Sequence, residues 1–199
     1  TKYGIVMAMP IEAEPFIRGF SMEPAETGPF PVYRHKDVIL IISGIGRVRA
    51  SSASAYLISR YNPEIMINQG TAGSNTADAE AGTVFSINTV FDRDLVLYRG
   101  PGYLKYELET FAGAPSATLL TSDRPCITAL DREKAAEIAD LSDMEGAAFA
   151  QVCSLFNKNG YIFKIVSDAP GAESFKSITE GIKKYSEDLF NYFKREINK

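Results

Sequence analysis

Short, almost wholly apolar runs recur along this chain, and several of them are followed by a turn and then by a helical pattern. Such runs are typical of strands buried on both faces of a sheet, because a half-exposed strand alternates apolar with polar residues. The alternation of these strands with helices predicts an α/β fold whose sheet is covered on both faces. The predicted strands span residues 3–9, 31–35, 37–42, 64–68, 83–90, 117–121 and 161–166.

Helical patterns occupy much of the chain between these strands. Residues 11–17, 47–61, 131–139 and 145–156 are predicted helices; the third is of the charged, surface type, and Ser142 or Asp143 is expected to cap the fourth. Residues 93–115 have little pattern and are predicted to be largely loop. Apolar residues at spacings of three and four predict a C-terminal helix with one apolar stripe, formed by Phe175, Ile178, Ile182, Tyr185, Leu189 and Phe193.

Composition argues against several classes of protein. The length of 199 residues predicts one domain, spanning residues 1–199. A net charge of −4 argues against a nucleic-acid binder. Two cysteines and one histidine exclude a four-cysteine zinc site, a disulfide framework and a multi-histidine metal site, and we expect neither metal nor cofactor. No aliphatic run is long enough to span a membrane and no leader is visible, so we expect a soluble, cytoplasmic protein.

The residues that follow each strand are where a ligand site is expected, because ligands of open α/β sheets bind beyond the carboxyl ends of the strands. Residues 43–46 (SGIG) resemble a dinucleotide fingerprint, but Arg49 stands where the third glycine belongs. A tight turn that presents backbone N–H groups fits better. Residues 70–73 (GTAG) place the hydroxyl of Thr71 among backbone amides that can hold a water, a hydroxyl or an anion. No arginine lies beside them, which argues against strong phosphate capture.

Three carboxyl groups near these positions each allow two interpretations. Glu12 is either a first-turn acid that complements a helix dipole or a carboxylate that faces the cleft. Glu145 is either another dipole acid or an acceptor for two adjacent hydroxyls, such as a ribose diol. Asp168 ends a very apolar strand, where it either forms a turn or serves as a general acid, because desolvation favours the protonated form that an acid needs.

Several segments together resemble the nucleoside phosphorylase/nucleosidase superfamily, and within it most closely the 5′-methylthioadenosine/S-adenosylhomocysteine nucleosidases. The segments are residues 4–12 (GIVMAMPIE), 43–48 (SGIGRV), 68–73 (NQGTAG), 143–148 (DMEGAA) and 165–168 (IVSD). Their order and spacing agree over nearly the whole chain. The resemblance implies a three-layer α/β/α sandwich with a mixed central sheet. It also implies a homodimer that hydrolyses the N-glycosidic bond of a purine nucleoside, with no nucleic-acid or membrane partner.

The resemblance also implies roles for individual residues. Asp168 would protonate a purine ring nitrogen, Glu12 would position and deprotonate the attacking water, and Glu145 would bind the ribose hydroxyls. Thr71 stands where these enzymes usually have a serine near the water. The remaining expected substrate contacts are Met144 under the sugar, Met9, Ser167, Cys126 in the base-binding loop, and Phe175 at the apolar end.

Departures from the family pattern leave alternatives open. Pro125 replaces the usual stacking aromatic, and residues 99–115 match little, so the base preference and the 5′-substituent stay open. The superfamily's phosphorylases generally carry an arginine where Asn68 stands, which favours water over phosphate as the nucleophile. The alternatives are a futalosine hydrolase, a phosphate-dependent phosphorylase and a catalytically silent nucleoside-binding module.

Overall fold

The structure is a computed structural model that describes residues 1–96, 102–111, 113–170 and 175–197. A mixed sheet forms its centre. The strand order is β10-β6-β8-β9-β5-β1-β4-β3-β2, with β7 paired to β6 and β10 also paired to β5. The strands are β1 (Tyr3–Met7), β2 (Glu23–Glu26), β3 (Val32–His35), β4 (Val38–Ile42), β5 (Ile65–Ser74), β6 (Val84–Val96), β7 (Tyr103–Glu107), β8 (Ser116–Thr121), β9 (Leu141–Asp143) and β10 (Asn159–Asp168).

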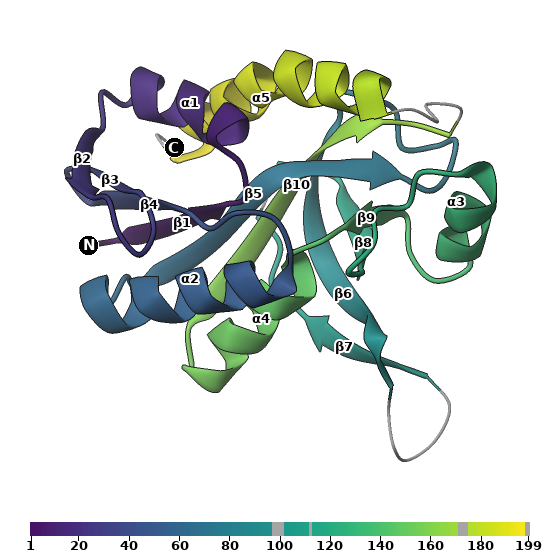
Figure 1. Cartoon of the computed structure of the whole chain (residues 1–199), viewed down its shortest axis with the longest axis horizontal. Coiled ribbons are helices and arrows are strands. Elements are labelled where there is room, and N and C mark those ends of the chain that lie inside the picture. The colour runs from purple at the N-terminus through teal and green to yellow at the C-terminus, as the bar shows by residue number, and fades with distance from the viewer. Residues whose placement is uncertain (97–101, 112, 171–174, 198–199) are drawn as a thin grey trace.

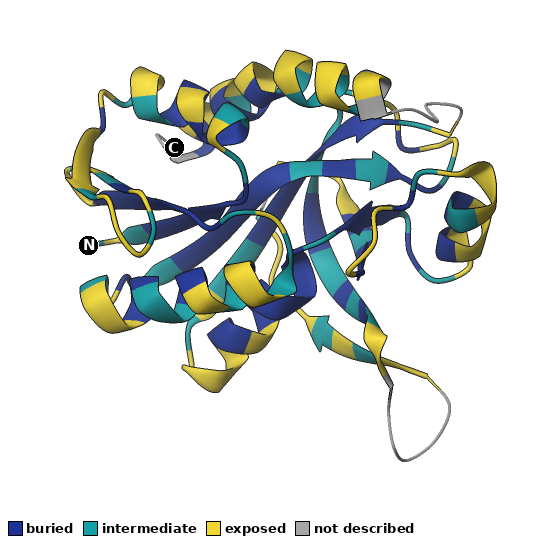
Figure 2. Cartoon of the chain, viewed as in Figure 1, coloured by how far each residue is buried: buried dark blue, intermediate teal, exposed yellow. Residues whose placement is uncertain are grey.

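Helices cover both faces of this sheet. Figure 1 shows α1 (Pro10–Gly19) and α5 (Phe175–Ile197) on one face, and α2 (Arg47–Tyr61) and α4 (Gly146–Leu155) on the other. The short helix α3 (Ala129–Ala136) lies beyond one end of the sheet. Figure 2 shows buried residues along the central strands and exposed residues on the outer sides of the helices. The three-layer sandwich is therefore confirmed. None of the helices in the described ranges has the length and apolarity that crossing a bilayer requires.

The central strands bring distant segments to one edge of the sheet. Strand β1 runs parallel to β4 and β5, and β10 runs parallel to β5. Their carboxyl ends therefore point the same way, as the sequence predicts. This places the start of α1, the SGIG turn and the ends of β5 and β10 beside one another.

The structure corrects several predicted boundaries. Strand β5 continues through residues 70–73, which are not a turn after the strand, because β10 pairs with it as far as Gly73. Strand β6 extends to Val96 and pairs with β7, so the predicted loop over residues 93–115 contains a strand. This hairpin projects from the body of the molecule, which explains its weak apolar pattern (Figure 1). Strands β2 and β9 were not predicted, because each is short and one contains a proline.

The predicted apolar stripe of α5 makes two kinds of contact, one with the core and one with a cavity. Leu189 and Phe193 are buried against α1, whereas Ile178 and Ile182 line a cavity beyond the sheet. Tyr185 packs against the margin of the same core. The stripe therefore both anchors α5 and closes one side of the cavity.

Replacing Phe16 with Ala is expected to lower the free energy of unfolding by about 3–5 kcal/mol. The Phe16 ring is fully buried and packs edge-on against Phe190, with ring centroids 5.3 Å apart. Urea unfolding measures the change, with Phe156→Ala as the control. Phe156 is 43% exposed, so its replacement is expected to change stability by less than about 0.5 kcal/mol. Equal effects of the two substitutions would contradict the assignment of this core.

Candidate active site

A cavity of about 280 Å³ opens at the carboxyl ends of β1, β5 and β10. Its size is close to the lower end of the range for small-ligand pockets. Eight of the nine residues expected in a site line it together: Met9, Glu12, Thr71, Cys126, Met144, Glu145, Ser167 and Asp168. The side chain of the ninth, Phe175, lies outside the described residues. The cavity is therefore the candidate active site.

Glu12 occupies both of the positions considered from the sequence, because it lies in the first turn of α1 and also lines the cavity. It lies in the first turn of α1, and its Oε2 accepts a hydrogen bond from the Met9 N–H at 3.2 Å. Its Oε1 accepts bonds from the Thr71 N–H at 2.8 Å and the Thr71 hydroxyl at 2.9 Å. Burial raises the pKa of Glu12, although the Thr71 N–H and the charge of Lys164 act in the opposite direction. Gly70 leaves room for it, because a Cβ there would lie 3.0 Å from Oε1.

Glu145 is held by the glycine-rich turn that follows β4. The backbone N–H of Gly46 donates to its Oε1 at 2.8 Å, so the predicted role of this turn in presenting an N–H group is confirmed. Gly44 and Gly46 have φ angles of 83° and 101°, which other residues rarely adopt. Burial, and then the negative charge of Asp143, raise the pKa of Glu145 to about 7.

A buried lysine that the sequence analysis missed places a positive charge near Glu12 and Glu145. Lys164 in β10 is 1% exposed, and its Nζ lies 2.9 Å from Oδ2 of Asp143. Burial works against its positive charge, but Asp143, Glu145 and Glu12 outweigh burial, and the pKa of Lys164 is raised. A buried lysine is rare unless it is paired, so a lysine inside an apolar strand was the sequence signal that a buried charged partner exists.

Asp143 connects this lysine to the start of α4. Its Oδ2 also accepts the Gly146 N–H at 2.8 Å, although the N-cap residue of α4 is Glu145 and not Ser142 or Asp143 as predicted. The Ser142 hydroxyl instead donates to Asn75 Oδ1 at 2.8 Å. Asp143 Oδ1 accepts the Thr121 hydroxyl at 2.6 Å. The carboxylate therefore fixes α4, and with it Glu145, relative to the sheet.

Asp168 is buried at the end of β10, as predicted, but it has a charged partner that was not. Its Oδ1 accepts the Ser167 hydroxyl at 2.6 Å, and its Oδ2 pairs with the guanidinium of Arg132. Arg132 belongs to α3 and is only 2% exposed, so α3 is not a purely surface helix. Nothing in the charged sequence of α3 distinguishes Arg132 from its exposed neighbours.

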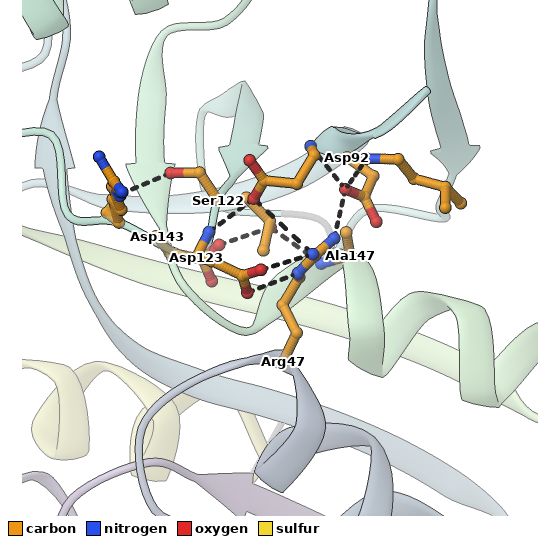
Figure 3. A network of polar contacts seen from close by, with 10 residues as sticks. Arg47, Asp92, Ser122, Asp123, Asp143 and Ala147 are labelled. Atoms are coloured by element: carbon orange, nitrogen blue, oxygen red, sulfur yellow. Dashed lines mark hydrogen bonds and ion pairs between the residues drawn. The ribbon is translucent and has the colours of Figure 1, made fainter. Parts of the chain in front are cut away.

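Arg47 joins the glycine-rich turn to Asp123, in the loop that follows β8 (Figure 3). Pro125 and Cys126 of the same loop line the cavity. Nε and Nη2 of Arg47 donate to the two carboxylate oxygens of Asp123 at 2.9 and 2.8 Å, and its Nη1 donates to Asp92 at 2.6 Å. The Arg47 guanidinium lowers the pKa of Asp123. This bidentate contact fixes the loop beside the cavity.

Comparison with known proteins now identifies the family. The family model described as "Phosphorylase superfamily" matches residues 2–122, which is more than half of the chain. This chain belongs to the phosphorylase superfamily. Superfamily members among its relatives include a 5′-methylthioadenosine/S-adenosylhomocysteine nucleosidase of Bacillus pumilus, 30% identical, with 79% of this chain and 80% of that protein covered. A nucleosidase of the same name from Buchnera aphidicola is 31% identical, with 81% and 80% covered.

Solved structures of two other proteins share the fold. A 5′-methylthioadenosine/S-adenosylhomocysteine nucleosidase of Helicobacter pylori superposes with a TM-score of 0.89 at 20% identity, covering 100% of this chain and 98% of that chain. The futalosine hydrolase of the same organism has a TM-score of 0.89 at 19% identity, with 100% and 97% covered. These structures confirm the predicted fold, and the family model confirms the predicted superfamily.

Proposed function

We propose that this protein hydrolyses the N-glycosidic bond of a purine nucleoside of the 5′-methylthioadenosine/S-adenosylhomocysteine type. The supporting observation is that Glu12, Glu145 and Asp168, from three separate parts of the chain, line one cavity. A purine anion is a poor leaving group, the ribosyl carbon becomes cationic, and water needs a base. Three carboxyl groups around one small cavity provide an acid for the departing purine, negative charge beside the cationic sugar and a base for the water.

The proposed reaction assigns one task to each group. As the bond between the base nitrogen and C1′ breaks, its electron pair passes to the purine, and Asp168 protonates a ring nitrogen. The cationic sugar is stabilised by the nearby carboxylates, in the manner of glycoside hydrolysis. Water bonds to C1′ and gives its proton to Glu12, which Thr71 holds in place. Glu145 accepts hydrogen bonds from the ribose hydroxyls, and Met9, Met144 and Ile182 pack around the sugar and its 5′-substituent.

Water suits this cavity better than phosphate. None of the described residues that line the cavity is an arginine or a lysine. Asn68, at the position where phosphorylases of the superfamily generally have arginine, instead donates from Nδ2 to the Val6 carbonyl at 3.1 Å. Because strong phosphate binding normally uses Arg or Lys, hydrolysis is the favoured reaction.

The sugar product distinguishes these reactions. The protein is incubated with 5′-methylthioadenosine and, separately, with futalosine, with and without phosphate. Hydrolysis yields the free reducing sugar in both buffers, whereas phosphorolysis yields a sugar 1-phosphate only when phosphate is present. Cleavage of futalosine alone would assign the chain to the futalosine hydrolases, with which it shares its fold.

Nucleoside affinity is expected to increase as the pH rises through about 7. Glu145 has a pKa of about 7, and its ionised form accepts hydrogen bonds from hydroxyls more strongly than its protonated form does. Calorimetric titration with a non-hydrolysable nucleoside analogue at about pH 6 and about pH 8 measures the change. The raised pKa also lowers folding stability as the pH rises from 4.5 to about 7, because the folded state then holds more protons than the unfolded state.

Glu145→Gln is the control for this pH effect. Glu12 and Lys164 also face Glu145, and the substitution leaves both of them in place. We expect the variant to bind weakly with no increase in affinity between the two pH values. A wild-type affinity that does not change with pH would contradict the assignment of Glu145 to the ribose.

We propose that the active form is a homodimer. The resemblance implies it, and apolar side chains are exposed: Ile45, which lines the cavity, Val48 on α2, and Leu95 and Tyr103 on the β6–β7 hairpin. Val48 is 80% exposed and Ile45 is 53% exposed, and a second copy of the chain would cover such apolar surface. Sedimentation velocity is expected to give a dimer, and Val48→Asp to give a monomer. A wild-type monomer at micromolar concentration would contradict this proposal.

We place the activity in the cytoplasm. Both cysteines of the chain, Cys126 and Cys153, are free and buried. Free thiols persist in a reducing compartment. Fractionation of cells that express the native gene tests the location, and recovery of the protein in a membrane or external fraction would contradict it.

A further inference from the structure

We propose that Arg132 is a positioning residue for glycosidic bond cleavage, and that it restricts the transferred proton to Oδ1 of Asp168. The inference rests on the proposed function, in which Asp168 is the general acid. The guanidinium of Arg132 pairs with Oδ2, while the Ser167 hydroxyl faces Oδ1 at 2.6 Å. The two carboxyl oxygens of Asp168 therefore have different partners.

The chemistry of these partners decides which oxygen carries the proton. A guanidinium has N–H donors and no acceptor, so a proton on Oδ2 would point at N–H groups of Arg132 and find no acceptor there. A hydroxyl both donates and accepts. The Ser167 hydroxyl has a second acceptor, the Ala72 carbonyl at 3.3 Å. When Oδ1 is protonated, the Ser167 hydroxyl can turn to Ala72, and Oδ1 keeps its proton for the base.

Arg132 also favours the transfer itself. Negative charge develops on Asp168 as its proton moves to the purine nitrogen. The buried guanidinium stabilises that charge more strongly than it stabilises the neutral acid, and only such a difference accelerates a reaction. Arg132 does not line the cavity, so it acts through Asp168 and not on the substrate.

The surroundings of Arg132 are built to hold this contact. Its Nη1 donates to the Ser74 carbonyl at the end of β5, which orients the guanidinium. Gly73 provides the space, because a Cβ there would lie 3.0 Å from Nη1 of Arg132 and 3.1 Å from Oδ2 of Asp168. Nε of Arg132 is buried without a hydrogen-bond partner. Burying a guanidinium costs desolvation free energy, and here one N–H is left unpaired as well, so the pair contributes little net stability. This points to a functional reason for the pair.

Two substrates separate an effect on the acid from an effect on the fold. One is 5′-methylthioadenosine, whose base must be protonated, and the other is the 4-nitrophenyl glycoside of the same sugar, whose leaving group needs no proton. We expect Arg132→Met to lower kcat for the nucleoside by about 10- to 100-fold with little change in KM. For the nitrophenyl glycoside we expect less than about a threefold change in kcat. Arg132→Lys keeps the charge and is expected to restore most of the lost rate.

Lys134→Met is the matched control, because Lys134 is an exposed cation on the same helix. It is expected to leave both rates unchanged. Equal losses on both substrates, or no loss on the nucleoside, would overturn the role of Arg132. If Arg132→Met does not fold, the neutral polar variant Arg132→Gln is compared on the same two substrates, with a loss confined to the nucleoside expected. Failure of the wild-type protein to release base from any purine nucleoside would overturn the proposed function, and this inference with it.

Discussion

Asp168→Asn is expected to slow base release from a purine nucleoside by about 100- to 10,000-fold. The amide has nearly the shape of the carboxyl group but cannot give a proton to the departing purine. The cavity keeps its lining, so the substrate still binds. Single-turnover measurement of base release, alongside calorimetric binding of a nucleoside, detects the loss of chemistry separately from any loss of affinity.

Asp188→Asn is the control for this substitution, because Asp188 is an exposed aspartate on α5. It is expected to leave the rate unchanged. An Asp168→Asn rate of base release within a factor of about 3 of the wild-type rate would contradict the role of Asp168 as the acid. Loss of base release with binding retained would exclude the alternative that the chain is a catalytically silent nucleoside-binding module.

Lys164→Met is expected to lower the free energy of unfolding by about 3–5 kcal/mol. The substitution removes the positive charge beside Asp143, at 2.9 Å, and leaves three buried carboxyl groups without a nearby lysine. Uncompensated buried charge is costly, because water no longer solvates it. Urea unfolding near neutral pH measures the loss, which is expected to shrink at lower pH as the carboxyl groups take up protons.

A second substitution tests the cause of that loss. Adding Asp143→Asn to Lys164→Met removes the unpaired charge, so the double variant is expected to recover part of the stability. Lys183→Met, on the exposed side of α5, is expected to change stability by less than about 0.5 kcal/mol. A loss of under about 1 kcal/mol in Lys164→Met would show that the buried pair contributes little.

The sequence carried enough information to locate the site because its parts follow apolar strands. Parallel strands bring their carboxyl ends to one edge, so Glu12, Thr71 and Asp168 had to converge if the strands were right. The glycine-rich turn before α2 was also readable, and its Gly46 N–H holds Glu145. The order and spacing of short motifs along the chain were therefore sufficient to predict most of the residues that line the cavity.

The partners of the carboxyl groups were not predictable in the same way. Arg132 reaches Asp168 from a helix 36 residues earlier in the chain, and only the packing of α3 makes the contact. Lys164 gave a signal, a charge within an apolar strand, but not the identity of its partner Asp143. Strand β7 was missed because its side chains alternate between exposed and half-buried on a projecting hairpin.

Release of free base from 5′-methylthioadenosine in phosphate-free buffer tests the central claim most directly. Chromatography of the products is expected to show adenine and the free methylthio sugar in equal amounts, without added phosphate, metal or cofactor. Nucleoside binding with no release of base from 5′-methylthioadenosine, futalosine or any other purine nucleoside would contradict the claim that Glu12, Glu145 and Asp168 form a hydrolytic site.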